Sequence, residues 1–124
     1  MPESDLFAFY GSLRIGMSNY DQYASSMSYQ RATRISGYRM YSLGDYPYIV
    51  KSENHGDKIV VEIFKSDNED IKMKIHKLEI DAGYFYEIIN LDGDDVGIYL
   101  FEQPGNDPWV KSGNWVQFFR QGNK

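Results

Sequence analysis

The hydrophobic residues of this chain recur at two spacings, one typical of strands and one typical of short helices. An early apolar and aromatic run, Leu6–Tyr10, is stopped by Gly11 and Ser12, which predicts a buried strand that ends in a tight turn. Runs rich in aromatic and β-branched residues predict further strands at 38–43, 48–50, 58–64, 84–91 and 96–101. The acidic and glycine-containing residues 92–95 predict a hairpin between the last two strands.

Helical spacing occurs in two segments. In the first, the residues at 20, 23, 24 and 27 form one face of a short helix, for which Ser18 is the predicted N-cap. In the second, Ser66 and Glu69 form a predicted capping box, and Ile71, Ile75 and Leu78 form an apolar stripe. A glycine at position 83 is expected to mark the end of this helix.

Strands interrupted by two short helices, with a strand-rich second half, predict an α+β fold. We expect a mixed, strongly curved sheet or a small β-barrel flanked by the two helices. A last helical turn is expected to pack Trp115 and Phe119, spaced i and i+4, against the body. With 124 residues and no repeat or linker, residues 1–124 are expected to form a single domain.

Composition excludes several classes of site. The net charge of −5, without a Lys/Arg cluster, argues against a nucleic-acid surface. Cysteine is absent and the two histidines have no partner at ligand spacing, so neither a thiolate nor a His-based metal site is expected. An acidic start without a signal-peptide pattern, and no apolar run of ~20 residues, predict a cytoplasmic protein that does not act at a membrane.

One carboxylate falls on the wrong face of its helix. Glu79 lies four residues after Ile75 and eight after Ile71, so it continues a stripe that is otherwise apolar. Partial burial and the nearby C-terminal end of the helix dipole would both raise its pKa, as a general acid/base at neutral pH requires. Alternatively, the helix ends early and Glu79 points into solvent.

Other charged positions are expected to be solvated. The lysines at 72, 74 and 77 occupy the predicted outer face of this helix, and His76 is expected beside them on its polar side. Glu62 and Glu87 lie within strands and are expected on a solvated strand face.

The turn at Gly11 and Ser12 has two interpretations. A strand, a Gly-Ser turn and a following helix tend to direct backbone N–H groups into one small space, which suits a carboxylate or a phosphate. Equally, Gly11 could serve only to turn the chain.

Several segments, in order, resemble the gamma-glutamylcyclotransferase-like family, which includes gamma-glutamylamine cyclotransferases and plant avirulence-induced proteins. Tyr10-Gly11-Ser12-Leu13-Arg14 resembles the family's Tyr-Gly-Ser-Leu signature after the first strand. The segments 37–41 with 44–47, and 60–64, are similar to its middle motifs. The segment 75–79, ending in Glu79 and followed by Tyr86, is similar to its Leu-Asp-x-x-Glu motif and later tyrosine.

The resemblance implies a fold and a reaction. The fold is a mixed β-barrel flanked by helices, with a cavity between the signature loop and the glutamate. The reaction releases 5-oxoproline from a small gamma-glutamyl amine or peptide without a metal or cofactor. By this resemblance the backbone of Tyr10, Gly11, Ser12 and Leu13 would hold the glutamyl carboxylate, Glu79 would be the catalytic acid/base, and Tyr86 would bind substrate.

Three positions depart from the family pattern: His76 replaces the usual aspartate, Val61 a frequent glycine, and Glu87 a frequent arginine. Val61 is expected to narrow or reshape the cavity. The alternatives to an enzyme are a non-catalytic binder of a small carboxylate metabolite on the same fold, or an interaction domain with a solvated glutamate. The residues around the pocket that would select the leaving amine are expected among Tyr46, Tyr48, Tyr84 and Trp109, and the oligomeric state is not encoded in any pattern.

Overall fold

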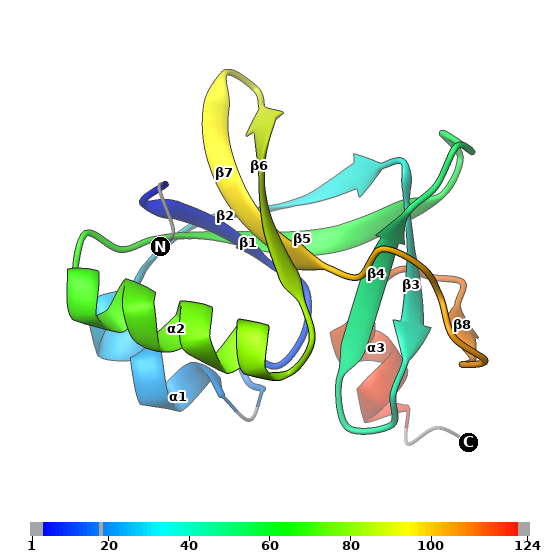
Figure 1. Cartoon of the computed structure of the whole chain (residues 1–124), viewed down its shortest axis with the longest axis horizontal. Coiled ribbons are helices and arrows are strands. Elements are labelled where there is room, and N and C mark those ends of the chain that lie inside the picture. The colour runs from blue at the N-terminus through cyan, green and yellow to red at the C-terminus, as the bar shows by residue number, and fades with distance from the viewer. Residues whose placement is uncertain (1–3, 18, 122–124) are drawn as a thin grey trace.

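The computed structural model describes residues 4–17 and 19–121, which form eight strands, three α-helices and one turn of 3-10 helix (Figure 1). In chain order these are β1 (Leu6–Phe9), α1 (Tyr20–Tyr23), η1 (Ala24–Ser26), β2 (Ser28–Ser36), β3 (Tyr38–Ser42), β4 (Pro47–Lys51), β5 (Lys58–Lys65), α2 (Glu69–Asp81), β6 (Phe85–Leu91), β7 (Asp94–Leu100), β8 (Trp109–Val110) and α3 (Trp115–Arg120).

The strands form two sheets. The larger has the order β2-β5-β1-β7-β6, and the smaller has the order β4-β3-β8. Every pairing is antiparallel except β1 with β7, so the larger sheet is mixed, as predicted. In the pairing of β1 with β5, Phe9 lies opposite Glu62, which places this acidic residue beside the end of the first strand.

The larger sheet is strongly curved but does not close. The β6–β7 hairpin rises from it as a curved ribbon (Figure 1), and Asp92 at its turn forms an exposed ion pair of 3.1 Å with Arg31 of β2. Within the described ranges, however, β2 and β6 remain the two edges of the sheet and do not pair with each other. The α+β fold with a mixed, curved sheet is therefore confirmed, whereas the alternative of a closed barrel is wrong.

Alternation along the strands divides the core into two clusters. On β1, Phe7 and Phe9 pack with Ile75 of α2 on one face of the sheet, whereas Ala8 packs on the other face. The second face is covered by α3, whose Trp115 is fully buried against that cluster. The predicted packing is thus confirmed for Trp115, whereas Phe119, whose ring centroid lies 5.5 Å from that of Trp115, is 38% exposed.

The predicted strands and the hairpin turn are present, with bounds that differ by a few residues. At the hairpin, Asp92 and Gly93 both have positive φ, 53° and 94°, which is the backbone that an Asp-Gly turn supplies. β2 is not among the predicted strands, because it is an edge strand with mostly exposed polar side chains and lacks a hydrophobic signal. The first helix is shorter than predicted, since it passes into 3-10 helix at Ala24; its proposed cap, Ser18, lies outside the described residues.

The start of α2 requires a correction. Its N-cap is Asn68 and not the predicted Ser66. The Asn68 side chain accepts a hydrogen bond from the backbone N–H of Ile71, whereas the Ser66 hydroxyl accepts one from the Asn68 backbone N–H. Lys72, predicted to be solvated, is 3% exposed and its Nζ pairs with Asp5 at 2.5 Å.

None of the helices in the described part of the chain has the length and apolar character needed to cross a bilayer.

Candidate active site

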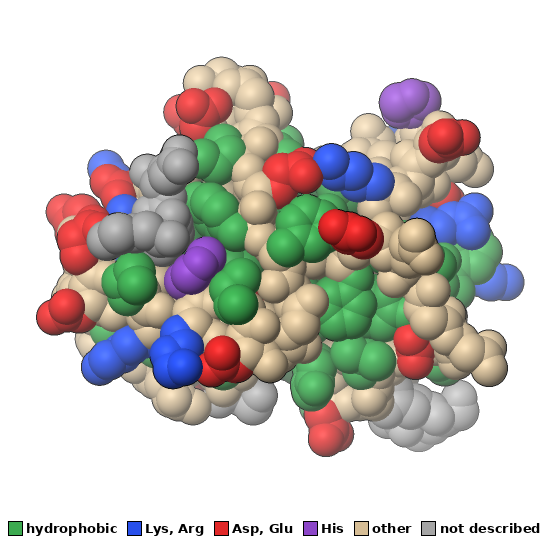
Figure 2. All heavy atoms as spheres, in the orientation of Figure 1, with side chains coloured by type: hydrophobic (Ala, Val, Ile, Leu, Met, Phe, Trp, Pro, Cys, Tyr) green, Lys and Arg blue, Asp and Glu red, His purple; other side chains and the backbone are tan. Residues whose placement is uncertain are grey.

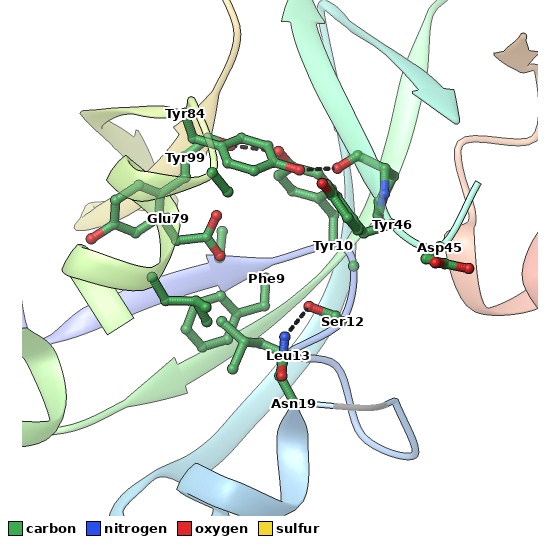
Figure 3. Close-up of a pocket in the computed structure, with 15 residues that line it drawn as sticks. Phe9, Tyr10, Ser12, Leu13, Asn19, Asp45, Tyr46, Glu79, Tyr84 and Tyr99 are labelled. Carbon is green, nitrogen blue, oxygen red and sulfur yellow. Dashed lines mark hydrogen bonds between the residues drawn. The ribbon is translucent and has the colours of Figure 1, made fainter. Parts of the chain in front are cut away.

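A pocket of about 250 Å³ lies where the end of β1, the C-terminal end of α2 and the β3–β4 turn meet (Figure 3). It joins the predicted signature loop to the predicted catalytic glutamate, which are far apart in the sequence. The residues that line it are Ala8–Leu13, Asn19, Asp45–Pro47, Leu78, Glu79, Ala82, Tyr84 and Tyr99.

The loop after β1 forms one wall of the pocket. Gly11 is required there because the ring of Pro47 approaches its backbone: a Cβ at this position would lie 2.8 Å from the Pro47 Cδ. The Arg14 amide donates to the Gly11 carbonyl at 3.0 Å and closes the turn. Asn19 donates two hydrogen bonds to Ser12, both at 2.9 Å. Its backbone N–H donates to the Ser12 carbonyl, and its side-chain amide donates to the Ser12 hydroxyl. Gly11 therefore does more than turn the chain.

The loop offers donors to a ligand. Among the hydrogen bonds of the described residues, none uses the backbone N–H of Gly11, Ser12 or Leu13. All three residues line the pocket, and neighbouring N–H groups in a turn of this kind form sites for anions. A small carboxylate is the ligand that such a wall suits.

Glu79 faces this loop across the pocket. The helix α2 continues to Asp81, so Glu79 lies inside its last turn, and the alternative of an early helix end is wrong. Its carboxylate points into the cavity (Figure 3), and no group in the described ranges donates a hydrogen bond to it. Burial raises the pKa of Glu79 to about 7. At neutral pH it can therefore both accept and release a proton.

Three tyrosines enclose the glutamate with their rings. The Tyr10 hydroxyl donates to the Tyr99 carbonyl at 2.6 Å and the Tyr84 hydroxyl donates to the Pro47 carbonyl, so both are occupied by backbone (Figure 3). Burial, reinforced by the nearby Glu79 carboxylate, raises the pKa of Tyr84 and of Tyr99 far above the ordinary value, and burial also raises that of Tyr10. All three stay neutral at pH 7 and form an apolar environment around the carboxylate.

A further aromatic group supports this wall from outside. The ring centroid of Phe101 lies 4.6 Å from that of Tyr84 and 4.5 Å from that of Tyr48. Figure 2 shows apolar side chains over much of one face of the molecule, with charged side chains among and around them. Of the residues expected to select the leaving amine, Tyr46 and Tyr84 line the pocket, whereas Tyr48 and Trp109 are not in its lining.

Other predicted residues lie elsewhere. Tyr86 is not in the pocket lining; its ring covers Gly97, and its hydroxyl accepts from the Ser4 amide at 3.2 Å. Val61 is fully buried in the core and does not line the pocket, so it does not narrow the cavity. Glu87 is half-buried, not fully solvated as predicted, and pairs with Lys51 at 2.8 Å.

Besides Lys72, two further titratable side chains lie elsewhere than the sequence pattern predicted. His76 is half-buried, not exposed, and its Nδ1 atom lies 2.9 Å from the Tyr99 hydroxyl. Glu62 is 8% exposed, not solvated, and pairs with Arg14 at 3.0 Å. Both faces of β5 are covered, which the alternation of a single strand cannot reveal.

The model of a protein family described as gamma-glutamyl cyclotransferase, AIG2-like, matches residues 7–117. The chain belongs to this family. The match contains every residue of the pocket, and membership suggests an activity of the gamma-glutamyl cyclotransferase type. Among curated proteins, no sequence match is found.

Solved structures show the same fold. An uncharacterized protein from Pyrococcus horikoshii, PH0828, has 24% sequence identity and a TM-score of 0.81, with 97% of each chain covered. A structure titled gamma-glutamyl cyclotransferase has 17% identity and a TM-score of 0.62, covering 86% of this chain and 72% of its own. A mouse AIG2-like protein has 14% identity and a TM-score of 0.58, with 86% of each chain covered.

Within this AIG2-like domain the sequence reasoning missed Tyr99 and Asn19 as pocket residues. Tyr99 lies in a strand whose alternation could place it on either face, and Asn19 resembles an ordinary helix-start residue. No group of three or more His, Asp or Glu side chains within residues 4–17 and 19–121 is arranged to hold a metal ion.

Proposed function

We propose that this protein is a gamma-glutamyl cyclotransferase that releases 5-oxoproline from a small gamma-glutamyl amine or peptide, with Glu79 as the general acid/base. The observation that carries the proposal is the position of Glu79: an unpaired carboxylate with a pKa of about 7, in the same pocket as the free N–H groups of the Gly11–Leu13 wall. The pocket is slightly smaller than the range of about 300–1,000 Å³ typical of ligand sites, which suits a small metabolite.

The charges of the pocket support a glutamyl ligand. No lysine or arginine lines it, so the α-carboxylate of the substrate would be held by the N–H groups of Gly11, Ser12 and Leu13 and by no ion pair. The α-ammonium group would then lie towards Glu79, whose carboxylate is the group in the pocket that can accept its proton. Both charged ends of the glutamyl group thus meet a complementary partner.

The reaction needs one proton carrier. Glu79 takes a proton from the α-ammonium group, and the neutral nitrogen attacks the γ-carbonyl carbon, forming the C–N bond of the five-membered ring. The bond from this carbon to the leaving nitrogen then breaks as Glu79 gives the proton to that nitrogen. The ring nitrogen still carries one proton too many, and Glu79 takes it and passes it to the released amine. The products are 5-oxoproline and the ammonium form of the amine, and no water is consumed.

The geometry suits this intramolecular attack. A ring closure requires the amine and the γ-carbonyl to be held close together, and such orientation contributes several kcal/mol to lowering the barrier (~7–11 in well-oriented models). Anchoring the α-carboxylate fixes one end of a flexible chain, and the apolar rings of Tyr10, Tyr84 and Tyr99 keep the reacting groups out of water. A general acid/base contributes about 10²–10⁴-fold more.

The test is release of 5-oxoproline from a panel of gamma-glutamyl amines and dipeptides. We expect turnover by the wild type and a loss of at least ~10²-fold in Glu79→Gln. The matched control is Glu87→Gln, which removes a surface carboxylate outside the pocket and should leave the rate unchanged. Equal release by wild type and Glu79→Gln would remove Glu79 from the mechanism. Binding of 5-oxoproline without any turnover would indicate the non-catalytic binder instead.

A further inference from the structure

A buried ion pair lies directly behind the pocket loop. Arg14 and Glu62 are 7% and 8% exposed, and the Arg14 Nε lies 3.0 Å from the Glu62 Oε2. Neither residue lines the pocket. Charged side chains are rarely buried unless they are paired, and the proposed reaction gives this pair no chemical role.

Glu62 holds the loop in two ways. Its Oε2 accepts from the side chain of Arg14, and its Oε1 accepts from the backbone N–H of Ile15 at 2.8 Å. One carboxylate therefore fixes both a side chain and the main chain of the residues that follow the Gly11–Leu13 wall. The Arg14 amide in turn donates to the Gly11 carbonyl, so the constraint continues into the wall itself.

The same network fixes the loop to two other elements. Glu62 lies opposite Phe9 in the β1–β5 pairing, immediately before the loop begins. The guanidinium group of Arg14 also donates a hydrogen bond from Nη1 to the Oδ1 of Asn114 at 2.9 Å. Asn114 is the N-cap of α3. β5 and α3 thus hold the residues that follow the Gly11–Leu13 wall, while the N–H groups of the wall make no hydrogen bond within the described residues.

The loop is also held by Asn19, which bonds Ser12, and by the buried side chain of Leu13, but its backbone is intrinsically flexible at two positions. It contains Gly11 and Gly16, and glycine loses more conformational freedom on ordering than any other residue. The N–H groups of the wall make no hydrogen bond to the described part of the chain, so their direction depends on contacts made elsewhere in the loop. Donors that bind an anion must be fixed in place before it arrives.

We propose that Glu62 is a positioning residue: through Arg14 and the Ile15 amide it holds the 11–15 loop in the arrangement that binds the substrate carboxylate. The inference rests on the proposed function for the identity of that carboxylate. The effect of Glu62 on the order of the loop does not depend on the proposed function, because the order of the loop can be measured without turnover.

The test compares Glu62→Gln with the wild type by two measurements. Glutamine keeps the size of the side chain and one acceptor but removes the charge that faces Arg14. We expect lower backbone NMR order parameters at residues 11–15 and a KM for a gamma-glutamyl amine raised about 10- to 100-fold, the scale of a small misplacement. The apparent pKa of kcat should stay at the wild-type value, because Glu79 itself is unchanged.

The matched control is Asp57→Asn. It breaks another ion pair, with Arg39 at 2.5 Å, whose partners lie outside the pocket. It should change neither the order of the loop nor KM. If Glu62→Gln does not fold, Arg14→Lys decides, because a lysine keeps the charge but lacks the fork that reaches Glu62 and Asn114 together.

The outcomes separate this inference from the proposed function. If Glu62→Gln leaves the order parameters at residues 11–15 unchanged, Glu62 does not position the loop. If Glu62→Gln folds with a less ordered loop but has an unchanged KM, the order of the loop does not matter for substrate binding, and the proposed role of Glu62 is also wrong. An equal effect in Asp57→Asn would show general destabilisation and would overturn it as well. A less ordered loop in a protein whose wild type has no turnover would reject the cyclotransferase and leave Glu62 as the residue that orders the loop.

Discussion

The ring of Pro47 lies against the backbone of Gly11, so closely that a Cβ on Gly11 would be 2.8 Å from the Pro47 Cδ. This contact joins the end of β1 in the larger sheet to the start of β4 in the smaller one. Both residues line the pocket, and the Pro47 carbonyl accepts the hydroxyl of Tyr84 on the opposite wall. The contact between Gly11 and Pro47, together with the bond from Tyr84 to Pro47, therefore shapes the pocket. We call the Gly11–Pro47 contact between the two sheets the seam.

Substitution of Gly11 by alanine is expected to force this seam apart. Because the φ of Gly11 is not in the left-handed region, the cost arises from overpacking against a rigid ring and is expected to be about 1–3 kcal/mol in the free energy of unfolding. The measurement is urea unfolding of Gly11→Ala, with 5-oxoproline release recorded beside it.

The control for this prediction is the double variant Gly11→Ala/Pro47→Ala. Removing the proline ring makes room for the added methyl group, so the double variant should be more stable than the sum of the two single effects predicts. Additive effects in the three proteins would show that the contact between Gly11 and Pro47 does not set the stability of the seam.

The second prediction concerns His76, which replaces the family's usual aspartate. Its Nδ1 atom lies 2.9 Å from the hydroxyl of Tyr99, a wall of the pocket, and burial lowers the pKa of His76 below its ordinary value. The neutral imidazole and the hydroxyl form a hydrogen bond whose donor depends on the tautomer. A double-mutant cycle of His76→Ala and Tyr99→Phe should give a coupling of about 0.5–1.5 kcal/mol.

Chemical denaturation of the four proteins of this cycle measures that coupling. Tyr29→Phe is the control, because Tyr29 is an exposed tyrosine and loss of its hydroxyl should not change stability. A coupling near zero would show that His76 and Tyr99 are neighbours without a stabilising bond.

Folding lowers the pKa of His76, so the stability that His76 contributes depends on pH. This contribution is fully present above the pKa of His76 in the unfolded chain and is lost as pH falls through its pKa in the folded protein.

The sequence predicted those features that depend on local pattern. The apolar run before Gly11 gave the first strand, the stripe on α2 placed Glu79 on its inner face, and the Asp-Gly turn gave the β6–β7 hairpin. In each case the signal lies in residues close in the chain. The resemblance to the family then supplied the link between the loop and the glutamate.

Burial that depends on distant elements was not predictable in the same way. Glu62 has the appearance of a solvated strand residue, but β5 lies between β1 and β2 and is covered on both faces, so the carboxylate is enclosed. Lys72 is similar: it is buried, and its Nζ pairs with Glu69 in the same helix and with Asp5, which is far away in the sequence. Tyr99 enters the pocket because β7 pairs in parallel with β1, a pairing that no local pattern specifies.

The third prediction is that pH moves the activity and the stability of this protein in opposite directions. Burial raises the pKa of Glu79 from 4.5 to about 7, so between these values the folded protein holds a proton that the unfolded chain has released. The penalty for ionising this carboxylate is absent below about pH 4.5 and complete above about pH 7, where it amounts to about 3 kcal/mol.

Glu79→Gln provides the reference for both quantities, because glutamine does not titrate. The unfolding free energy of the wild type, relative to Glu79→Gln, should fall as pH rises from about 4.5 to 7, whereas kcat/KM of the wild type should rise over the approach to pH 7 as the base of the free enzyme ionises. Denaturant titrations and initial rates at matched pH values measure the two curves. A single apparent pKa in both would identify one group as the cause. If the stability difference stays constant with pH, Glu79 does not titrate with a raised pKa in the folded protein, and this prediction is wrong.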